Sequence, residues 1–97
     1  MKIVAVTACP TGIAHTYMAA EQLERTAKSL GHSIKVETQG AMGIENQLSK
    51  ADISECDGVI FAADIEIEDR DRFAGKKLVQ VSVQEAIKNP KGVLSKL

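Results

Sequence analysis

One stretch of the chain combines a cysteine with residue types that form anion-binding loops. Residues 8–16 read Ala-Cys-Pro-Thr-Gly-Ile-Ala-His-Thr, between an apolar run at residues 2–7 and a segment with helical periodicity. Cys9 therefore stands where a strand is expected to end and a short loop turns directly into a helix. Backbone N–H groups and the positive end of the helix dipole converge at such a place, so a thiol there ionises easily and a phosphate attached to it is held. The pattern predicts a phosphocysteine site.

The expected phosphate donors are backbone amides that follow the cysteine. Pro10 has no N–H group to offer, whereas Gly12 allows the backbone to curl around an anion without a clash from Cβ. The hydroxyls of the two threonines are additional donors. For His15 two interpretations stand: it caps or packs against the helix, or it orients and partly neutralises the phosphate. The expected phosphate-binding residues are Thr11, Gly12, Ile13, Ala14, His15 and Thr16.

Four strands are predicted from short apolar or alternating runs. The second run alternates apolar and polar residues, which suits a strand at a sheet edge, and residues 39–43 after it are expected to form a flexible loop. The first and third runs are apolar on both faces, as central parallel strands are. The predicted strands are residues 2–7, 33–38, 57–63 and 77–81.

Helix patterns separate these strands. Gly31 is placed to end the first helix, Ser49 and Ser82 are expected N-caps of two shorter helices, and the last of these should stop before Pro90. One helical turn is expected at residues 69–73. The first helix has a stripe of residues at steps of three and four that is expected to be buried: Ile13, Tyr17, Ala20, Leu23, Ala27 and Leu30.

The order of these elements predicts an α/β fold in a single domain that spans residues 1–97. Right-handed crossovers favour three layers: an open four-stranded parallel sheet of order 2-1-3-4 with helices on both faces, Rossmann- or flavodoxin-like. The first strand then lies at the switch point of the topology, where open α/β sheets bind ligands beyond the carboxyl ends of their strands. Cys9 occupies that point.

The composition argues against several classes of protein. The net charge is −1 with both signs spread along the chain, which provides no basic surface for nucleic acid. No apolar run approaches the ~20 residues of a membrane span, and the N-terminus lacks the layout of a signal peptide, so we expect a cytoplasmic protein without direct membrane insertion. No cluster has metal-ligand spacing and the glycines match neither nucleotide-binding fingerprint, so neither a metal nor a cofactor is expected.

Other residues that bear on chemistry lie outside the loop. Cys56 is expected to be a structural thiol at the opposite end of the sheet, roughly 20 Å from Cys9 and beyond disulfide reach. Asp64, Gln39 and Gly40 follow strands and share the edge with Cys9, where they can contact a ligand, although Asp64 can equally cap the next turn. The acidic run at residues 66–69 is a solvated face or orients a basic partner surface.

The spacing after the cysteine resembles that of cysteine-dependent phosphatases, which have Cys-x5-Arg-Ser/Thr. Here the pattern is Cys9-x5-His15-Thr16, and no general acid is identifiable. Phosphatases need the charged, bidentate arginine to stabilise the transition state. Without it, the loop holds a phosphoryl group on sulfur but releases it poorly to water, which favours a phosphoryl carrier. The alternatives are a low-molecular-weight type phosphatase, a thiol redox protein, which the lack of a second nearby cysteine disfavours, and a non-enzymatic regulatory docking module.

Residues 9–16, followed by Met-Ala-Ala-Glu at 18–21, resemble the active-site segment of the fructose-type enzyme IIB of the bacterial phosphoenolpyruvate-dependent sugar phosphotransferase system. The resemblance spans nearly the whole chain, although Lys77 stands where many relatives have proline. It implies a phosphoryl relay in which enzyme IIA donates from phosphohistidine, Cys9 accepts, and a fructose-like sugar bound by the membrane enzyme IIC receives the group. The resemblance continues at residues 36–40, 43–46, 62–64 and 72–76.

Overall fold

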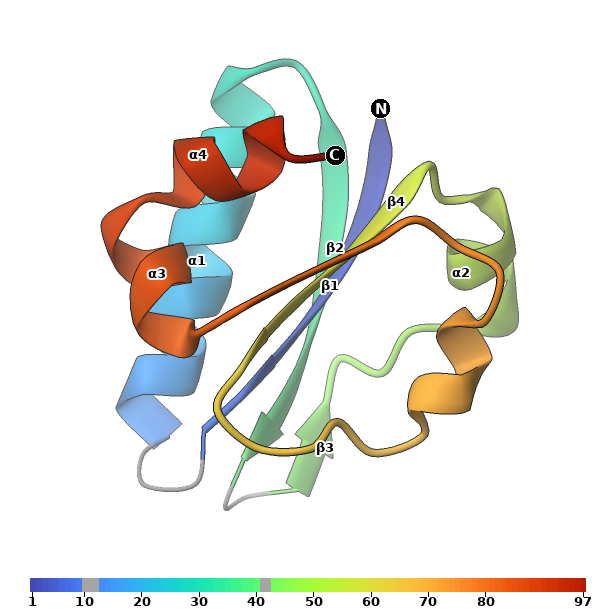
Figure 1. Ribbon diagram of the computed structural model, residues 1–97, viewed down its shortest axis with the longest axis horizontal. Coiled ribbons are helices and arrows are strands. Elements are labelled where there is room, and N and C mark those ends of the chain that lie inside the picture. The colour runs from blue at the N-terminus through green and yellow to red at the C-terminus, as the bar shows by residue number, and fades with distance from the viewer. Residues whose placement is uncertain (10–12, 41–42) are drawn as a thin grey trace.

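A five-stranded mixed sheet forms the middle layer of the protein (Figure 1). The computed structural model describes residues 1–9, 13–40 and 43–97. The strand order is β3-β2-β1-β4-β5, with β2, β1, β4 and β5 parallel and β3 antiparallel to β2. The strands are β1 (Lys2–Ala8), β2 (Ser33–Gly40), β3 (Gly43–Glu45), β4 (Gly58–Ala63) and β5 (Leu78–Val81).

Helices cover both faces of this sheet, as the sequence predicted. On one face lie α1 (Ile13–Ser29), α3 (Val83–Lys88) and α4 (Pro90–Ser95), and on the other lie α2 (Lys50–Glu55) and the 3-10 helix η1 (Arg70–Phe73) (Figure 1). Both chain ends lie at the end of the sheet opposite to β3. The α/β class is therefore confirmed. Among the described residues, the helices are too short or too polar to cross a membrane.

The prediction of a four-stranded, wholly parallel sheet was wrong, because a fifth strand, β3, is added antiparallel beside β2; the four predicted strands are parallel neighbours in the expected order, as β2-β1-β4-β5. β2 continues to Gly40, and β3 then pairs antiparallel with it through Gln39 opposite Ile44 and Gly40 opposite Gly43. β2 is therefore not an edge strand, and the expected loop at residues 39–43 is in part strand. β3 has only three residues and begins with Gly43 at φ 90°, so its sequence shows neither an alternation pattern nor a high strand propensity. The strand forms because it pairs with β2.

Two core clusters fill the space between the layers. Ile3 and Ala5 of β1 face the α1 side, and Val4 and Val6 face the α2 side, so the alternation of one strand feeds both clusters. On the α2 side Phe61 meets Phe73 of η1 edge to face, with ring centroids 5.2 Å apart. The central strand β1 is thus enclosed on both faces.

The buried stripe of α1 differs from the predicted one. Ala20, Leu23 and Ala27 are buried as expected, but Tyr17 and Leu30 are exposed. The Tyr17 hydroxyl donates to a carboxylate oxygen of Glu45 on β3, and the residue stays exposed instead of joining the core. Leu30 lies in the turn after the helix. The stripe is completed by Thr16 and Ala19, which are both buried.

The local signals for helix ends behave as the sequence predicted. Gly31 has φ 82° after α1. The Ser49 hydroxyl accepts from the Asp52 amide, with the Asp52 carboxylate accepting in return from the Ser49 amide, and the Ser82 hydroxyl accepts from the Glu85 amide. These caps fix where α2 and α3 start, and hence how each helix leaves the sheet.

Candidate functional site

Cys9 lies at the carboxyl end of the central strand. It follows Ala8, the last residue of β1, whose register partners are Gln39 on β2 and Ala63 on β4. The Asp64 amide donates to the Ala8 carbonyl at 3.0 Å, so β1 and β4 stay together up to this point. Cys9 is 6% exposed and packs with the core cluster on the α1 side. Cys9 thus directly follows the last residue at which β1 is paired with both β2 and β4.

Cys9 lines a cleft of about 290 Å³. One wall is the hairpin of β2 and β3, and the other is the segment after β4. Within the described parts of the chain, no lysine or arginine lines this cleft, whereas Glu66 and Glu68 do. The lining residues are Cys9, Gln39, Gly40, Gly43, Ile44, Ile65, Glu66 and Glu68. Gln39 and Gly40 therefore share a cleft with Cys9, as their place after a strand indicated.

The expected phosphate-binding residues divide into three groups. Thr11 and Gly12, together with Pro10, lie outside the described residues. Ala14 and His15 are exposed in the first turn of α1, which begins at Ile13. N–H groups of a first helical turn have no carbonyl partner earlier in the helix, so they can bind an anion.

Thr16 has a different environment from its neighbours. Its side chain is 1% exposed, and its hydroxyl lies 3.8 Å from the position that a Cβ on Gly40 would take. Its carbonyl accepts from the Thr7 hydroxyl at 3.1 Å. Thr16 therefore packs the start of α1 against β1 and β2, directly behind the cleft.

His15 and Asp64 line a second cleft, of about 170 Å³, beside α3. A carboxylate oxygen of Asp64 accepts from the Val83 amide at 3.2 Å, so Asp64 caps the start of α3. Neither residue lines the Cys9 cleft. The cap differs from the one predicted, because Asp64 binds the first amide of α3, 19 residues later, and not the turn that follows it in the chain.

Cys56 lies far from this edge in the topology. It is buried just before β4, and it lines a separate cavity with Lys2 and Ser33, at the amino ends of β1 and β2. Neither Cys9 nor Cys56 is in a disulfide. Among the residues that the structure describes, no group of three or more His, Cys, Asp or Glu side chains is arranged to hold a metal ion.

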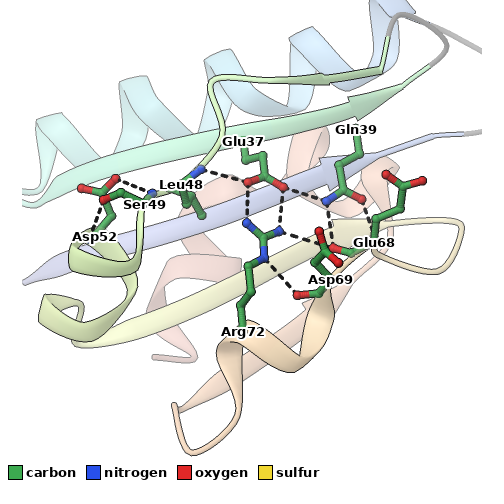
Figure 2. Close-up of polar contacts among 8 residues, drawn as sticks. All are labelled: Glu37, Gln39, Leu48, Ser49, Asp52, Glu68, Asp69 and Arg72. Carbon is green, nitrogen blue, oxygen red and sulfur yellow. Dashed lines mark hydrogen bonds and ion pairs between the residues drawn. The ribbon is translucent and has the colours of Figure 1, made fainter.

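A buried carboxylate supports the cleft from the α2 side. Glu37 on β2 is 0% exposed and is held by both terminal nitrogens of Arg72, each at 2.9 Å (Figure 2). It also accepts from the Leu48 amide at 2.9 Å and from Gln39 Nε2 at 2.7 Å. Burial alone raises the pKa of Glu37, but the donors from Arg72, Gln39 and Leu48 together outweigh it and leave the pKa below its ordinary value.

Sequence reasoning missed this network because it assigned β2 to the sheet edge. Lys35 and Glu37 share the polar face of an alternating strand, and an edge strand can leave both in solvent. β3 pairs with β2 only at residues 38–40, but the chain that continues from β3 places the Leu48 amide against Glu37, and η1 contributes Arg72. A carboxylate enclosed in this way needs a cationic partner, which would have directed attention to Arg70 and Arg72.

Comparisons with known proteins identify the family and agree with this fold. A family model described as "PTS system, Lactose/Cellobiose specific IIB subunit" matches residues 4–96. The chain is 52% identical over 96 residues to the PTS system fructose-like EIIB component 2 of Escherichia coli (strain K12), covering 99% of this chain and 91% of that protein. It is also 52% identical to the fructose-like PTS system EIIBC component of the same strain, over 100% of this chain and 20% of that protein.

A solved structure agrees as well. The crystal structure of a domain from the fructose-specific IIABC component of Borrelia burgdorferi is similar to this fold, with a TM-score of 0.93 and 50% identity. The match covers 97% of this chain and 89% of that one.

Proposed function

The chain belongs to the IIB family of the sugar phosphotransferase system, and from that premise we propose that Cys9 is the residue that carries the phosphoryl group. The role of the chain in phosphoryl transfer follows from the family, and the predicted fructose-type IIB identity is confirmed. The observation that carries the proposal is the place of Cys9, in a cleft at the carboxyl end of the central strand and beside the start of α1.

The proposed chemistry has two displacements. The Cys9 thiolate attacks phosphorus in a phosphohistidine, the S–P bond forms, the P–N bond breaks, and the electron pair stays on the imidazole nitrogen. A sugar hydroxyl oxygen then attacks the same phosphorus, the S–P bond breaks, and the thiolate leaves with the electron pair while the hydroxyl proton passes to a base or to water. Both steps depend mainly on positioning and on stabilising the phosphoryl charge.

The backbone of the loop and of the first turn of α1 supplies that stabilisation in this proposal. The residues are those expected from the sequence: Thr11, Gly12, Ile13, Ala14, His15 and Thr16. Support comes from α1, which begins at Ile13, four residues after Cys9. The 17-residue helix directs its positive end toward the carboxyl edge of the sheet.

The absence of a cationic side chain in the described lining of the cleft supports a carrier over a phosphatase. A phosphatase stabilises its transition state with a fixed arginine, whereas here the residue at that spacing, His15, lines the neighbouring cleft with Asp64. Acidic Glu66 and Glu68 in the cleft wall do not attract phosphate by charge. A phosphoryl group on Cys9 would therefore be held mainly by amides.

The proposed partners are a IIA protein as phosphohistidine donor and a membrane IIC component that presents a fructose-like sugar. The names of the relatives support this, because a fructose-like EIIBC and a fructose-specific IIABC component contain regions similar to this chain. Exposed Met18 and Ile65 lie at the two clefts, and apolar side chains of this kind suit a transient protein interface. We place the reaction in the cytoplasm, because it requires a reduced thiol.

The two cysteines offer a matched test. Sugar phosphorylation is measured with phosphorylated IIA donor and membranes that contain a fructose-type IIC, using wild type, Cys9→Ser and Cys56→Ser. Cys9→Ser should lose phosphorylation of the sugar, and Cys56→Ser should retain it. Relay by Cys9→Ser at a rate near wild type would overturn the assignment of Cys9.

A further inference from the structure

The Gln39 side chain acts as a hydrogen-bonding partner for the main chain of the cleft wall. Gln39 Oε1 accepts from the Glu68 amide at 2.8 Å, and Gln39 Nε2 donates to the Glu68 carbonyl at 3.2 Å (Figure 2). One carboxamide thus pairs with both main-chain groups of Glu68, as a neighbouring strand would. Gln39 is 5% exposed, so these bonds are shielded from water.

Glu37 determines which way the Gln39 carboxamide points. A carboxylate only accepts hydrogen bonds, so the amide nitrogen of Gln39 must face Glu37 Oε2, which it does at 2.7 Å. The amide oxygen is then directed to the Glu68 N–H. Glu37 is itself fixed by two bonds from Arg72 and one from the Leu48 amide, so its orientation is set by η1 and by the segment that precedes α2.

Arg72 reaches the same segment from η1. Its Nε donates to the Asp69 carbonyl at 2.9 Å, and its Nη2 donates to the Glu68 carbonyl at 3.3 Å (Figure 2). The segment between β4 and η1 has no ladder bonds of its own along residues 65–68, although the side chain of Ile67 is buried in the α2-side core. The side chains of Gln39 and Arg72 bind the main chain of this segment, and Arg70 adds an exposed ion pair to the Glu66 side chain.

This anchored segment is one wall of the Cys9 cleft, to which it contributes Ile65, Glu66 and Glu68. We propose that Glu37, Gln39 and Arg72 are positioning residues that hold this wall in place for docking of the IIA protein that donates phosphoryl to Cys9. The inference rests on the proposed function, which identifies phosphorylated IIA as the donor. A preformed wall avoids the ordering cost that a loose segment would add to each docking event.

The wall contacts a docked protein and not the reacting phosphorus, so loosening it should weaken docking more than the chemical step. In Gln39→Leu the side chain keeps its bulk but loses all three hydrogen bonds. We expect the half-saturating concentration of phosphorylated IIA to rise about fivefold, with the rate at saturation within about twofold of wild type. Single-turnover transfer from phosphohistidine to Cys9, measured over a range of donor concentrations, separates the two quantities.

Asp52→Asn is the matched control. It removes one partner of the Lys35–Asp52 ion pair and half of the α2 capping box, on the same side of the sheet but outside the Cys9 cleft. It should lower stability and leave the half-saturating concentration unchanged. Arg72→Lys keeps the charge but loses the paired nitrogens that bind both oxygens of Glu37. It should raise the half-saturating concentration of phosphorylated IIA, as Gln39→Leu does. If Gln39→Leu acted only through a general loss of stability, Asp52→Asn would raise the half-saturating concentration of phosphorylated IIA by a similar factor. An equal rise in the two variants would therefore overturn the proposal.

Hydrogen exchange provides a readout that does not depend on phosphoryl transfer. The Glu68 amide, which donates to Gln39 Oε1, should exchange faster in Gln39→Leu than in wild type, while the amides of β1 keep their protection. Wild-type exchange of the Glu68 amide in this variant would overturn the positioning role whether or not Cys9 is the carrier. Failure of wild-type Cys9 to accept phosphoryl would instead overturn the proposed function.

Discussion

Two ion pairs lie on the same face of β2, two residues apart, and they differ in almost every physical respect. Lys35 reaches Asp52 at 2.8 Å near the amino end of the strand, with the lysine side chain 68% exposed. Glu37 reaches Arg72 at 2.9 Å nearer the carboxyl end, with the carboxylate side chain 0% exposed. The first pair is solvated and adds to the cap of α2, whereas the second is enclosed and joins β2 to η1 and the cleft wall.

The difference shows that the neighbours of a charge decide its role more than the charge itself does. A solvated pair gains little from association, because water solvates each partner nearly as well. An enclosed carboxylate without its partner would keep the cost of desolvation and lose the compensation for it. The Glu37–Arg72 pair should therefore be far more sensitive to loss of one partner than the Lys35–Asp52 pair.

The largest effect is expected from Arg72→Met, which leaves Glu37 buried without its cation. The free energy of unfolding at neutral pH should fall by about 3 kcal/mol, measured by urea denaturation. Arg70→Met is the control, since Arg70 is an exposed neighbour on η1 that pairs with Glu66 at 3.6 Å, and its loss should be under about 1 kcal/mol. Equal losses in the two variants would mean that the burial of Glu37 has no energetic consequence.

A smaller difference is expected in the pH dependence of stability. The pKa of Glu37 is below its ordinary 4.5, so its contribution is complete above about pH 4.5 and is lost as pH falls through the folded-state value. Hydrogen bonding from Lys35, followed by that from Ser49, lowers the pKa of Asp52 from 3.8 to about 2, so its contribution is lost mainly between about pH 4 and pH 2.

These windows give each pair a separate signature in unfolding curves measured from pH 7 to acid. Glu37→Gln should show a shallower loss of stability than wild type as the pH falls below about 4.5. The stability of Asp52→Asn should fall with the wild-type slope between about pH 4.5 and pH 4, and its slope should become shallower than that of wild type only below about pH 4. A wild-type slope in Glu37→Gln would show that Glu37 is not held ionised in the folded protein.

The smallest effect is expected from Lys35→Gln. Most of the lysine side chain is in solvent, so its interaction with Asp52 is screened by salt. The midpoint of urea unfolding should shift slightly at low ionic strength, and the shift should disappear in about 1 M NaCl. A shift that persists at high salt would mean that this pair resembles the buried one after all.

Local chemistry made part of the fold predictable from sequence. The left-handed glycine at Gly31 and the hydroxyl caps at Ser49 and Ser82 depend on residues a few positions apart, and each lies where the pattern indicated. The place of Cys9 is also a local matter, since β1 ends at the residue before it and α1 begins four residues after it.

The parts that could not be predicted depend on contacts between distant residues. β3 exists because β2 lies beside it, and three residues are too few to carry a period. Glu37 is enclosed by contacts from Leu48, which follows β3, and from Arg72 of η1, which comes more than 30 residues later in the chain. Tyr17 fits a buried stripe by spacing, but its hydroxyl is drawn to Glu45 on the new strand. The strand count and the place of Tyr17 therefore trace to the missing β3, whereas Leu30 is exposed because α1 ends before it.

The most direct test of the account is to find the atom that receives the phosphoryl group. Wild-type protein is incubated with phosphorylated IIA without sugar, digested under conditions that preserve phosphocysteine, and mapped by peptide mass analysis. The account predicts a phosphoryl group on Cys9 that persists until a sugar acceptor and IIC are added. A phosphoryl group on His15 or Cys56, or rapid release of phosphate to water from Cys9, would contradict it.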